Sequence, residues 1–196
     1  MSNIKKAVSC VVLCVLIVSL CACGEENKSD DYADIYGEII GGLEDDELFA
    51  VIETNASSPV LLVTSQVYND GMGNQAALDC DVYYLADKEV KNIGALESLG
   101  TAYPISYDKT GIYTASGHDM QRFTIEDSGV IKLAEGIYEQ FDENGNATYI
   151  REKEDKTEEI TEEEYYAIYE KYGNATVVSF SFGASAAASA DTVSKQ

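Results

Sequence analysis

Between residues 47 and 150, hydrophobic residues recur mostly at every second position, which is the period of a β-strand. Along residues 78–84, Leu78, Cys80 and the next apolar residues share one parity while polar residues dominate the other, so one face should be buried. Residues 60–64 are apolar on both faces, as expected of a central strand. Turns rich in Asp, Asn and Gly separate these runs and predict a mainly antiparallel, twisted or curved β-meander.

The pattern divides this part of the chain into about ten short strands. Asn144-Gly145 marks the tip of the last hairpin, because Asn-Gly is the strongest short hairpin signal. Residues 82–93 and 122–133 resemble each other as a weak internal repeat. The charged residues 151–159 are expected to be a solvated connection. The expected strands are residues 48–52, 60–64, 78–84, 90–93, 102–106, 112–115, 121–125, 130–133, 138–141 and 148–150, with a possible edge strand at 177–182.

Two helices are expected to flank the strands along the chain. Residues 31–43 carry apolar side chains at helical spacing, after acidic residues that suit a helix N-terminus. Thr161 and Glu164 have the spacing of a capping box, which predicts a helix over residues 162–172. Strands followed by a terminal helix, with a helix also at the start, assign the chain to the α+β class.

The N-terminus has the composition of a bacterial export signal. Lys5 and Lys6 form a basic start, an apolar run follows, and a small residue precedes Cys23. The residues Leu20-Cys21-Ala22-Cys23 resemble a lipobox, which implies a diacylglyceryl thioether on Cys23. The alternative is an uncleaved helix over residues 7–23, slightly shorter than the roughly 20 residues that span a bilayer.

These patterns give four segments along the chain. Residues 1–22 are the expected lipoprotein signal peptide, and residues 23–30 are a polar tether. Residues 31–182 form a single globular α+β domain of ordinary size. The Ala/Ser-rich residues 183–196 are expected to be a disordered tail.

The charge and the cysteines restrict the function further. The net charge of −22 becomes −24 when the signal with Lys5 and Lys6 is removed, which argues against nucleic acid as a partner. Three of the five cysteines leave with the signal and Cys23 carries lipid, so the mature protein cannot form an intramolecular disulfide. The remaining Cys80 is expected on the inner face of its strand as a small hydrophobe.

Few residues suggest chemistry. Ser116, His118 and Asp119 lie close together in an expected loop and are the candidate ligand-binding residues, with His118 the only histidine of the chain. The acidic loop that starts at Asp142 lacks the Gly and Glu that an EF-hand requires at its sixth and twelfth positions, so it is interpreted as a hairpin tip. No catalytic residue, metal site or cofactor is predicted.

The order of segments resembles a known group of proteins. A lipobox, an amphipathic helix, a strand such as residues 49–52 and a segment such as residues 160–166 before Tyr172-Gly173-Asn174 occur together. This layout is similar to small lipoproteins of Gram-positive, clostridial-type gut bacteria. Residues 53–58 replace the Asp-rich turn of that group, so no calcium role is carried over. The resemblance implies an envelope location and no particular activity.

We therefore expect a lipid-anchored protein on the extracytoplasmic face of the cell membrane, exposed at the cell surface. Its expected role is a binding module whose partner is an envelope protein or a glycan. Two alternatives remain open: an envelope hydrolase that uses carboxylates or the loop at His118, and an accessory subunit of a transporter or secretion assembly.

Overall fold

The computed structural model describes residues 29–182 of the 196-residue chain. The predicted signal peptide, the lipidation site Cys23, most of the predicted tether and the predicted tail at residues 183–196 lie outside the described residues.

The described chain contains two helices and fourteen strands. Helix α1 spans Ser29–Gly41 and helix α2 spans Glu162–Gly173. The strands are β1 (Leu48–Ile52), β2 (Val60–Thr64), β3 (Tyr68–Asn69), β4 (Gln75–Ala76), β5 (Asp79–Ala86), β6 (Glu89–Glu97), β7 (Ser106–Asp108), β8 (Gly111–Ala115), β9 (Asp119–Ile125), β10 (Ile131–Phe141), β11 (Ala147–Lys153), β12 (Lys156–Ile160), β13 (Thr176–Val177) and β14 (Ser181–Phe182).

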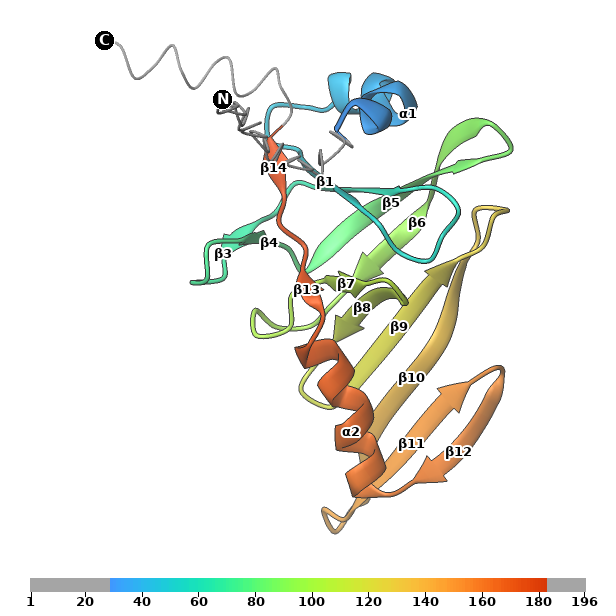
Figure 1. The fold of residues 1–196 in the computed structure, drawn as a ribbon. Helices are drawn as coiled ribbons and strands as arrows, with labels where there is room; N and C mark the ends of the chain where they lie inside the picture. Colours follow the sequence, from blue (N-terminus) through green and yellow to red (C-terminus); the bar gives the residue numbers. More distant parts are fainter. Residues whose placement is uncertain (1–28, 183–196) are drawn as a thin grey trace, which may run out of the picture.

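The strands form two large sheets and one short hairpin, in which all pairs are antiparallel (Figure 1). The first sheet has the order β14-β1-β2-β5-β6 and the second the order β12-β11-β10-β9-β8-β7-β13, while β3 pairs with β4. The α+β class and the mainly antiparallel pairing are therefore confirmed. The strands do not form one continuous meander, because a turn that contains Gly100 and Pro104 ends the first sheet after β6. That turn occupies most of the strand predicted at residues 102–106.

The two sheets face each other across the main hydrophobic core. The first sheet contributes alternate residues of β1 and β5, and the central strand β2 is buried along its whole length, as its two apolar faces predict. The second sheet contributes Ile112 and Ile125. Cys80 is 2% exposed within this core, so its predicted inward position is confirmed.

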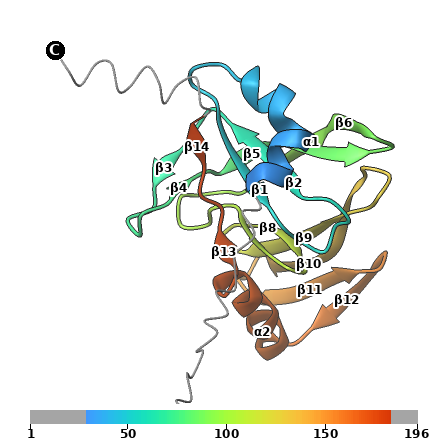
Figure 2. The same ribbon diagram turned by 45° about the horizontal axis from the view of Figure 1, so that its top comes forward.

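Each helix covers the outer face of one sheet (Figure 2). The apolar side of α1 packs on residues of β1 and β2, and the Tyr36 hydroxyl donates a hydrogen bond to the Pro59 carbonyl oxygen at 2.5 Å. Helix α2 packs on β8–β11 through Tyr165, Ile168 and Tyr172. The order of layers is therefore helix, sheet, sheet, helix.

Two sequence-based expectations in the C-terminal half are wrong. Residues 151–159 are not a solvated connection: they end β11 and form most of β12, joined by a tight turn at Glu154 and Asp155 with positive φ angles of 52° and 60°. The two strands predicted at residues 130–133 and 138–141 are one long strand, β10. A β-bulge between Leu133 and Glu135 shifts the register of the strand. The alternation of apolar and polar residues is therefore broken there, and the sequence pattern predicts two strands instead of one.

The last described residues join the two sheets. The single edge strand predicted at residues 177–182 is instead two short strands, with β13 pairing to β7 in one sheet and β14 pairing to β1 in the other. Between them, the Val178 amide donates to the Ile105 carbonyl and the Phe180 amide to the Gln75 carbonyl, at 3.0 and 2.9 Å. This segment, residues 176–182, is called the C-terminal connector below. It fixes the two sheets to each other along one side.

Candidate functional site

Ser116, His118 and Asp119 lie together in the turn between β8 and β9. The Ser116 hydroxyl donates to the Asp119 carboxylate at 2.6 Å, and the Ser116 amide donates to the Asp119 carbonyl oxygen at 2.9 Å. The His118 amide in turn donates to Ser116 Oγ at 3.2 Å. These bonds explain why the three residues are close: they shape the turn.

The imidazole of His118 does not face the serine hydroxyl. Its Nδ1 atom lies 2.8 Å from Glu139 Oε2 on β10, and the ring makes an edge contact with Phe141. The His118 side chain is 64% exposed, so the contact is on the surface. Activation of a serine requires a base within hydrogen-bond reach of its hydroxyl. Among the described residues, the hydroxyl of Ser116 is bonded to a carboxylate instead, and the three residues do not form a catalytic triad.

A row of tyrosines runs along α2 beside this turn. The rings of Tyr165, Tyr169 and Tyr172 follow one another at centroid distances of 6.0 Å. The Tyr169 hydroxyl donates to the Ser116 carbonyl at 2.6 Å and the Tyr172 hydroxyl to the Pro104 carbonyl at 2.8 Å. Burial raises the pKa of all three phenols above the ordinary value, so they remain neutral donors. Most of the row therefore attaches the helix to the sheet.

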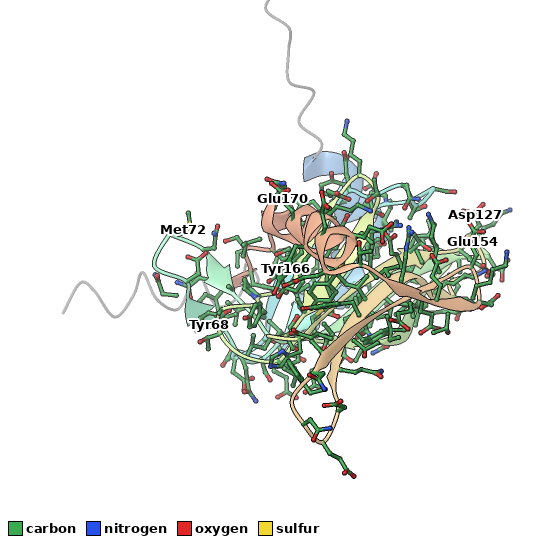
Figure 3. The ribbon with its side chains drawn as sticks, turned by 90° about the horizontal axis from the view of Figure 1, so that it is seen from below. Tyr68, Met72, Asp127, Glu154, Tyr166 and Glu170 are labelled. Carbon is green, nitrogen blue, oxygen red and sulfur yellow. The ribbon has the colours of Figure 1, made fainter. Side chains whose placement is uncertain are left out.

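One tyrosine of this helix faces outward. Tyr166 is 54% exposed and labelled on α2 in Figure 3, where it lies away from Met72 at the tip of the β3–β4 hairpin. The ring of Tyr166 contacts that of Tyr165 edge-on at 5.3 Å. A single exposed ring is common on protein surfaces and does not define a platform for a sugar.

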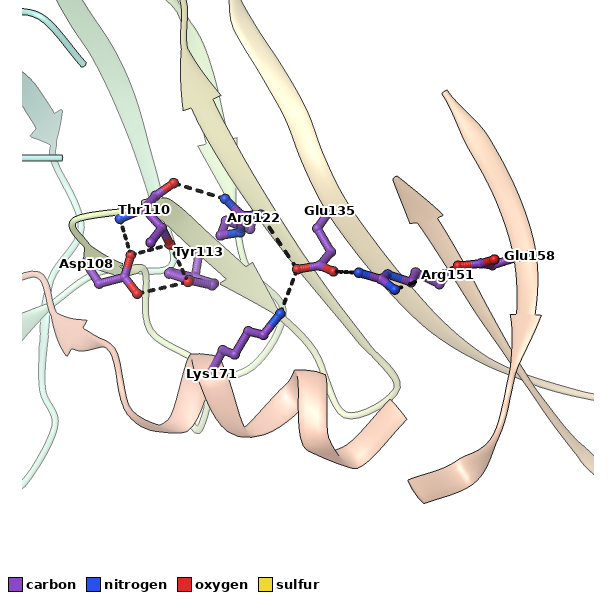
Figure 4. Close-up of polar contacts among 8 residues, drawn as sticks. All are labelled: Asp108, Thr110, Tyr113, Arg122, Glu135, Arg151, Glu158 and Lys171. Atoms are coloured by element: carbon purple, nitrogen blue, oxygen red, sulfur yellow. Dashed lines mark hydrogen bonds and ion pairs between the residues drawn. The ribbon is translucent and has the colours of Figure 1, made fainter. Parts of the chain in front are cut away.

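A buried carboxylate collects three cations between α2 and the second sheet (Figure 4). Glu135 is 1% exposed, and its oxygens lie 2.5 Å from Arg151 Nη2, 3.0 Å from Lys171 Nζ and 3.6 Å from Arg122 Nη2. Arg151 also approaches the exposed Glu158 at 3.7 Å. This group is called the Glu135 cluster below.

The charges of the Glu135 cluster offset one another, as in a cluster that stabilises the fold. Burial alone would raise the pKa of the Glu135 carboxyl, but the hydrogen bonds from Lys171 and Arg151 hold it below the usual value. A hollow of about 450 Å³ opens beside Arg122 and Lys171, and Asp108 lines it as well. The positive charges are therefore already matched by carboxylates and leave little attraction for a further anion.

An apolar hollow lies between α1, the edge of β1 and the C-terminal connector. It encloses about 640 Å³, and its walls include Gly37 and Ile40 of α1, Val51 of β1 and Val177 and Ser179 of the connector. We call it the α1–β1 groove. Its size falls within the range of pockets that hold small ligands or short peptide segments.

A second hollow of about 820 Å³ continues the α1–β1 groove toward the turn after β1. The two share Tyr32, Val51, Tyr107 and Thr176 as lining residues. At the far end, Glu53 accepts a hydrogen bond from the Tyr32 hydroxyl at 3.0 Å. The result is a long open channel with an apolar middle and a polar end.

Sequence reasoning did not identify this groove. It exists because β14 covers only Leu48 and Phe49 of β1, so the rest of the strand edge is left to the groove. The pairing joins segments more than 130 residues apart, and no local pattern predicts it. The period-two signal in residues 48–52 gave the strand but not which edge would remain open.

Two acidic loops have the same internal geometry. Asp70 accepts hydrogen bonds from the amide and the side chain of Asn74, and Asp142 does the same with Asn146. The predicted hairpin tip at Asn144-Gly145 is confirmed, with Gly145 at a φ of 82°. Across residues 29–182, no three His, Cys, Asp or Glu side chains are grouped so that they could bind a metal ion.

Comparison with family models, curated proteins and solved structures found no match to this chain. Neither α1 nor α2, the two helices of the described range, has the length and apolar character needed to cross a membrane.

Proposed function

We propose that this protein is a lipid-anchored binding module on the extracytoplasmic face of a bacterial membrane. The sequence of the first 23 residues supports the anchor: a basic start, an apolar run and the lipobox-like Leu20-Cys21-Ala22-Cys23. Acylation of Cys23 with a diacylglyceryl group provides two chains, which is enough for stable attachment. In this proposal, α1 is the first folded element after the tether and places the globular body outside the membrane.

The α1–β1 groove is the observation that carries the binding role. It is open, has an apolar middle and is formed by three separate parts of the chain: α1, β1 and the C-terminal connector. Pockets with an apolar lining and a few polar groups are the usual binding sites of proteins.

The hydrolase alternative has weaker support. It required a base beside a nucleophile or a cleft with opposed carboxylates. The Ser116 hydroxyl is bonded to Asp119, and the imidazole of His118 is engaged with Glu139 on an exposed surface. None of the three hollows described above includes Ser116, His118 or Asp119.

Replacement of the anchor residue tests the location. The wild-type protein should fractionate with membranes, and the Cys23→Ala variant should be found in the soluble extracytoplasmic fraction. Cys21→Ala is the matched control, because it changes the neighbouring cysteine without removing the acylated thiol. Membrane association of Cys23→Ala equal to that of the wild type would overturn the proposed anchor.

Amide hydrogen exchange tests the binding role. Addition of detergent-solubilised envelope from the same bacterium should slow exchange in residues 49–52 of the wild type. Gly37→Phe fills the groove, and it should abolish the slowing; the space around the Gly37 Cβ position is open, so the fold should be retained. Identical exchange with and without envelope would contradict a ligand in the α1–β1 groove.

A further inference from the structure

Strand β1 has a free edge that faces the α1–β1 groove. On one side it pairs with β2 over its full length, Leu48 to Ile52. On the other side β14 pairs only with Leu48 and Phe49. A continued β14 would run opposite Val51, but the connector turns away there and gives its amides to the Gln75 and Ile105 carbonyls.

The backbone of Val51 points into this opening. The Ser181 hydroxyl donates to the Phe49 carbonyl oxygen, which shows that this carbonyl faces the edge occupied by β14. Backbone polar groups alternate between the two edges of a strand, so Val51, two residues further on, turns its N–H and C=O to the same edge. Val51 lines both halves of the channel. No strand of the described residues pairs with Val51 on that side.

Of the four outer edge strands of the two sheets, β6 and β12 are protected by charge, and β13 and β14 are only two residues long. Strand β12 presents Lys156, Glu158 and Glu159 as exposed residues, and β6 presents Glu89 and Lys91. Charged side chains on an edge strand prevent the addition of another chain. The residues of β1, by contrast, are Leu, Phe, Ala, Val and Ile. The free part of β1 is therefore the edge of these sheets that is best suited to accept a strand.

The charge around the groove favours one kind of added strand, a basic one. Residues 32–53, which include most of α1 and the whole of β1, contain seven Asp and Glu and no Lys or Arg. Glu53 lies at the end of β1 and lines the polar end of the channel with Asp108 and one base, Lys109. A negative field of this kind attracts cationic partners and repels acidic ones.

We propose that the α1–β1 groove binds an extended peptide segment with alternating basic and aliphatic residues, which adds as a strand to the free edge of β1. The segment donates to and accepts from the backbone of Val51, places aliphatic side chains on the apolar middle of the groove and directs basic side chains toward Glu53. Three to four residues cover the free edge, at a rise of about 3.3 Å per residue. This inference rests on the proposed binding function and specifies its ligand as a protein.

Synthetic peptides test the proposal on the full lipidated chain in detergent. The probe is a fluorescein-labelled peptide of sequence Lys-Val-Lys-Val-Lys, and its binding is followed by fluorescence anisotropy. Two matched peptides separate the contributions: Glu-Val-Glu-Val-Glu reverses the charge, and a Lys-Val-Lys-Val-Lys peptide with alternate N-methyl groups keeps the charge but removes backbone donors. The basic peptide should bind at least about tenfold more tightly than either, because the acidic peptide loses the charge attraction and the N-methylated peptide loses backbone hydrogen bonds.

Two protein variants locate the site. Gly37→Phe should weaken binding of the basic peptide at least about tenfold, whereas Gly41→Phe, on the same helix but outside the groove, should change it less than about twofold. Thermal unfolding of both variants checks that the fold is intact. Equal affinity for the basic and acidic peptides would overturn the proposed preference for a basic segment. Equal affinity for the basic and N-methylated peptides would overturn strand addition. A strong gain in affinity on removal of residues 183–196 would also overturn it, because the chain's own tail would then be the occupant.

Failure of the proposed peptide ligand can be distinguished from failure of the proposed binding function. If envelope extract slows exchange in residues 49–52 but the basic peptide neither binds nor slows it, the binding module stands and its peptide ligand is wrong. If neither slows exchange, both are wrong.

Discussion

At the scale of single residues, Glu135 has the most unusual environment in the described chain. A side chain that is 1% exposed bears a charge and is surrounded by Arg151, Lys171 and Arg122. Removal of one member of a buried ionic group leaves the others desolvated and unmatched, which costs more than the pair contributes. The cluster is therefore expected to be a point where substitution is poorly tolerated.

Glu135→Gln should lower the free energy of unfolding by about 2 to 3 kcal/mol, since it leaves three cations without their central carboxylate. Glu158→Gln removes only the exposed partner of Arg151 and should cost less than about 1 kcal/mol. Urea denaturation of both variants measures the two effects. Equal midpoints would show that the Glu135 cluster contributes no more than a surface ion pair.

The same carboxylate makes stability depend on pH. Its pKa in the folded protein is lower than in the unfolded chain, where an ordinary Glu titrates near about 4.3. Its contribution is fully present above that unfolded value and is lost as the pH falls through the lower folded pKa. The stability difference between wild type and Glu135→Gln should therefore shrink as the pH falls from above to well below the unfolded value of about 4.3. A difference that stays constant over this range would contradict the lowered pKa.

Cys80 is the thiol that the core protects. Burial raises its pKa to about 12, so the reactive thiolate is scarce in the folded protein. A thiol reagent at about pH 8 should modify Cys80 in the Cys23→Ala protein at least about a hundredfold more slowly than in the unfolded protein. Ser65→Cys in the same background supplies an exposed thiol as the control. Rapid modification of Cys80 under native conditions would contradict its burial.

These two residues show what a sequence pattern can and cannot predict. Cys80 occupies the apolar parity of a regular strand, so its inward position follows from the period of two. Glu135 has the same parity in the sequence as Leu133, yet the β-bulge between them places Glu135 opposite Arg122 on the side of α2. Its burial could not be predicted without knowledge of the bulge.

At the scale of elements, α2 shows how strong a local signal can be. Thr161 Oγ1 accepts from the Glu164 amide, and the Glu164 carboxylate accepts from the Thr161 amide, which confirms the predicted capping box. The helix was predictable because its start depends on residues three positions apart. The β11–β12 hairpin was missed for the opposite reason: its turn, Glu154-Asp155, lacks the Gly or Asn that usually marks such turns.

A glycine substitution in the β11–β12 turn tests whether this turn is strained. Asp155 has a φ of 60°, a conformation that costs energy for most L-residues but not for Gly. Asp155→Gly should raise the free energy of unfolding by about 0.5 to 1 kcal/mol. Glu143→Gly, at the exposed tip of the neighbouring hairpin, has no positive φ to relieve and should give no gain. Equal effects of the two substitutions would show that the turn of the β11–β12 hairpin is not strained.

At the scale of the whole molecule, the C-terminal connector completes the fold. Its two short strands attach β1 of the first sheet and β7 of the second, so the ends of the described chain meet at the α1–β1 groove. The sequence predicted a strand in this region but could not predict that it would divide between two sheets. The division opens the free edge of β1, from which the proposed binding role follows.

The lipid anchor on Cys23 is the central claim about where the protein is located. Mass spectrometry of the protein extracted from bacterial membranes tests it most directly, because it reads the mature N-terminus and its modification together. We predict a chain that begins at Cys23 and carries a diacylglyceryl group on the thiol. An N-terminus at Met1, or an unmodified Cys23, would contradict a lipid-anchored binding module.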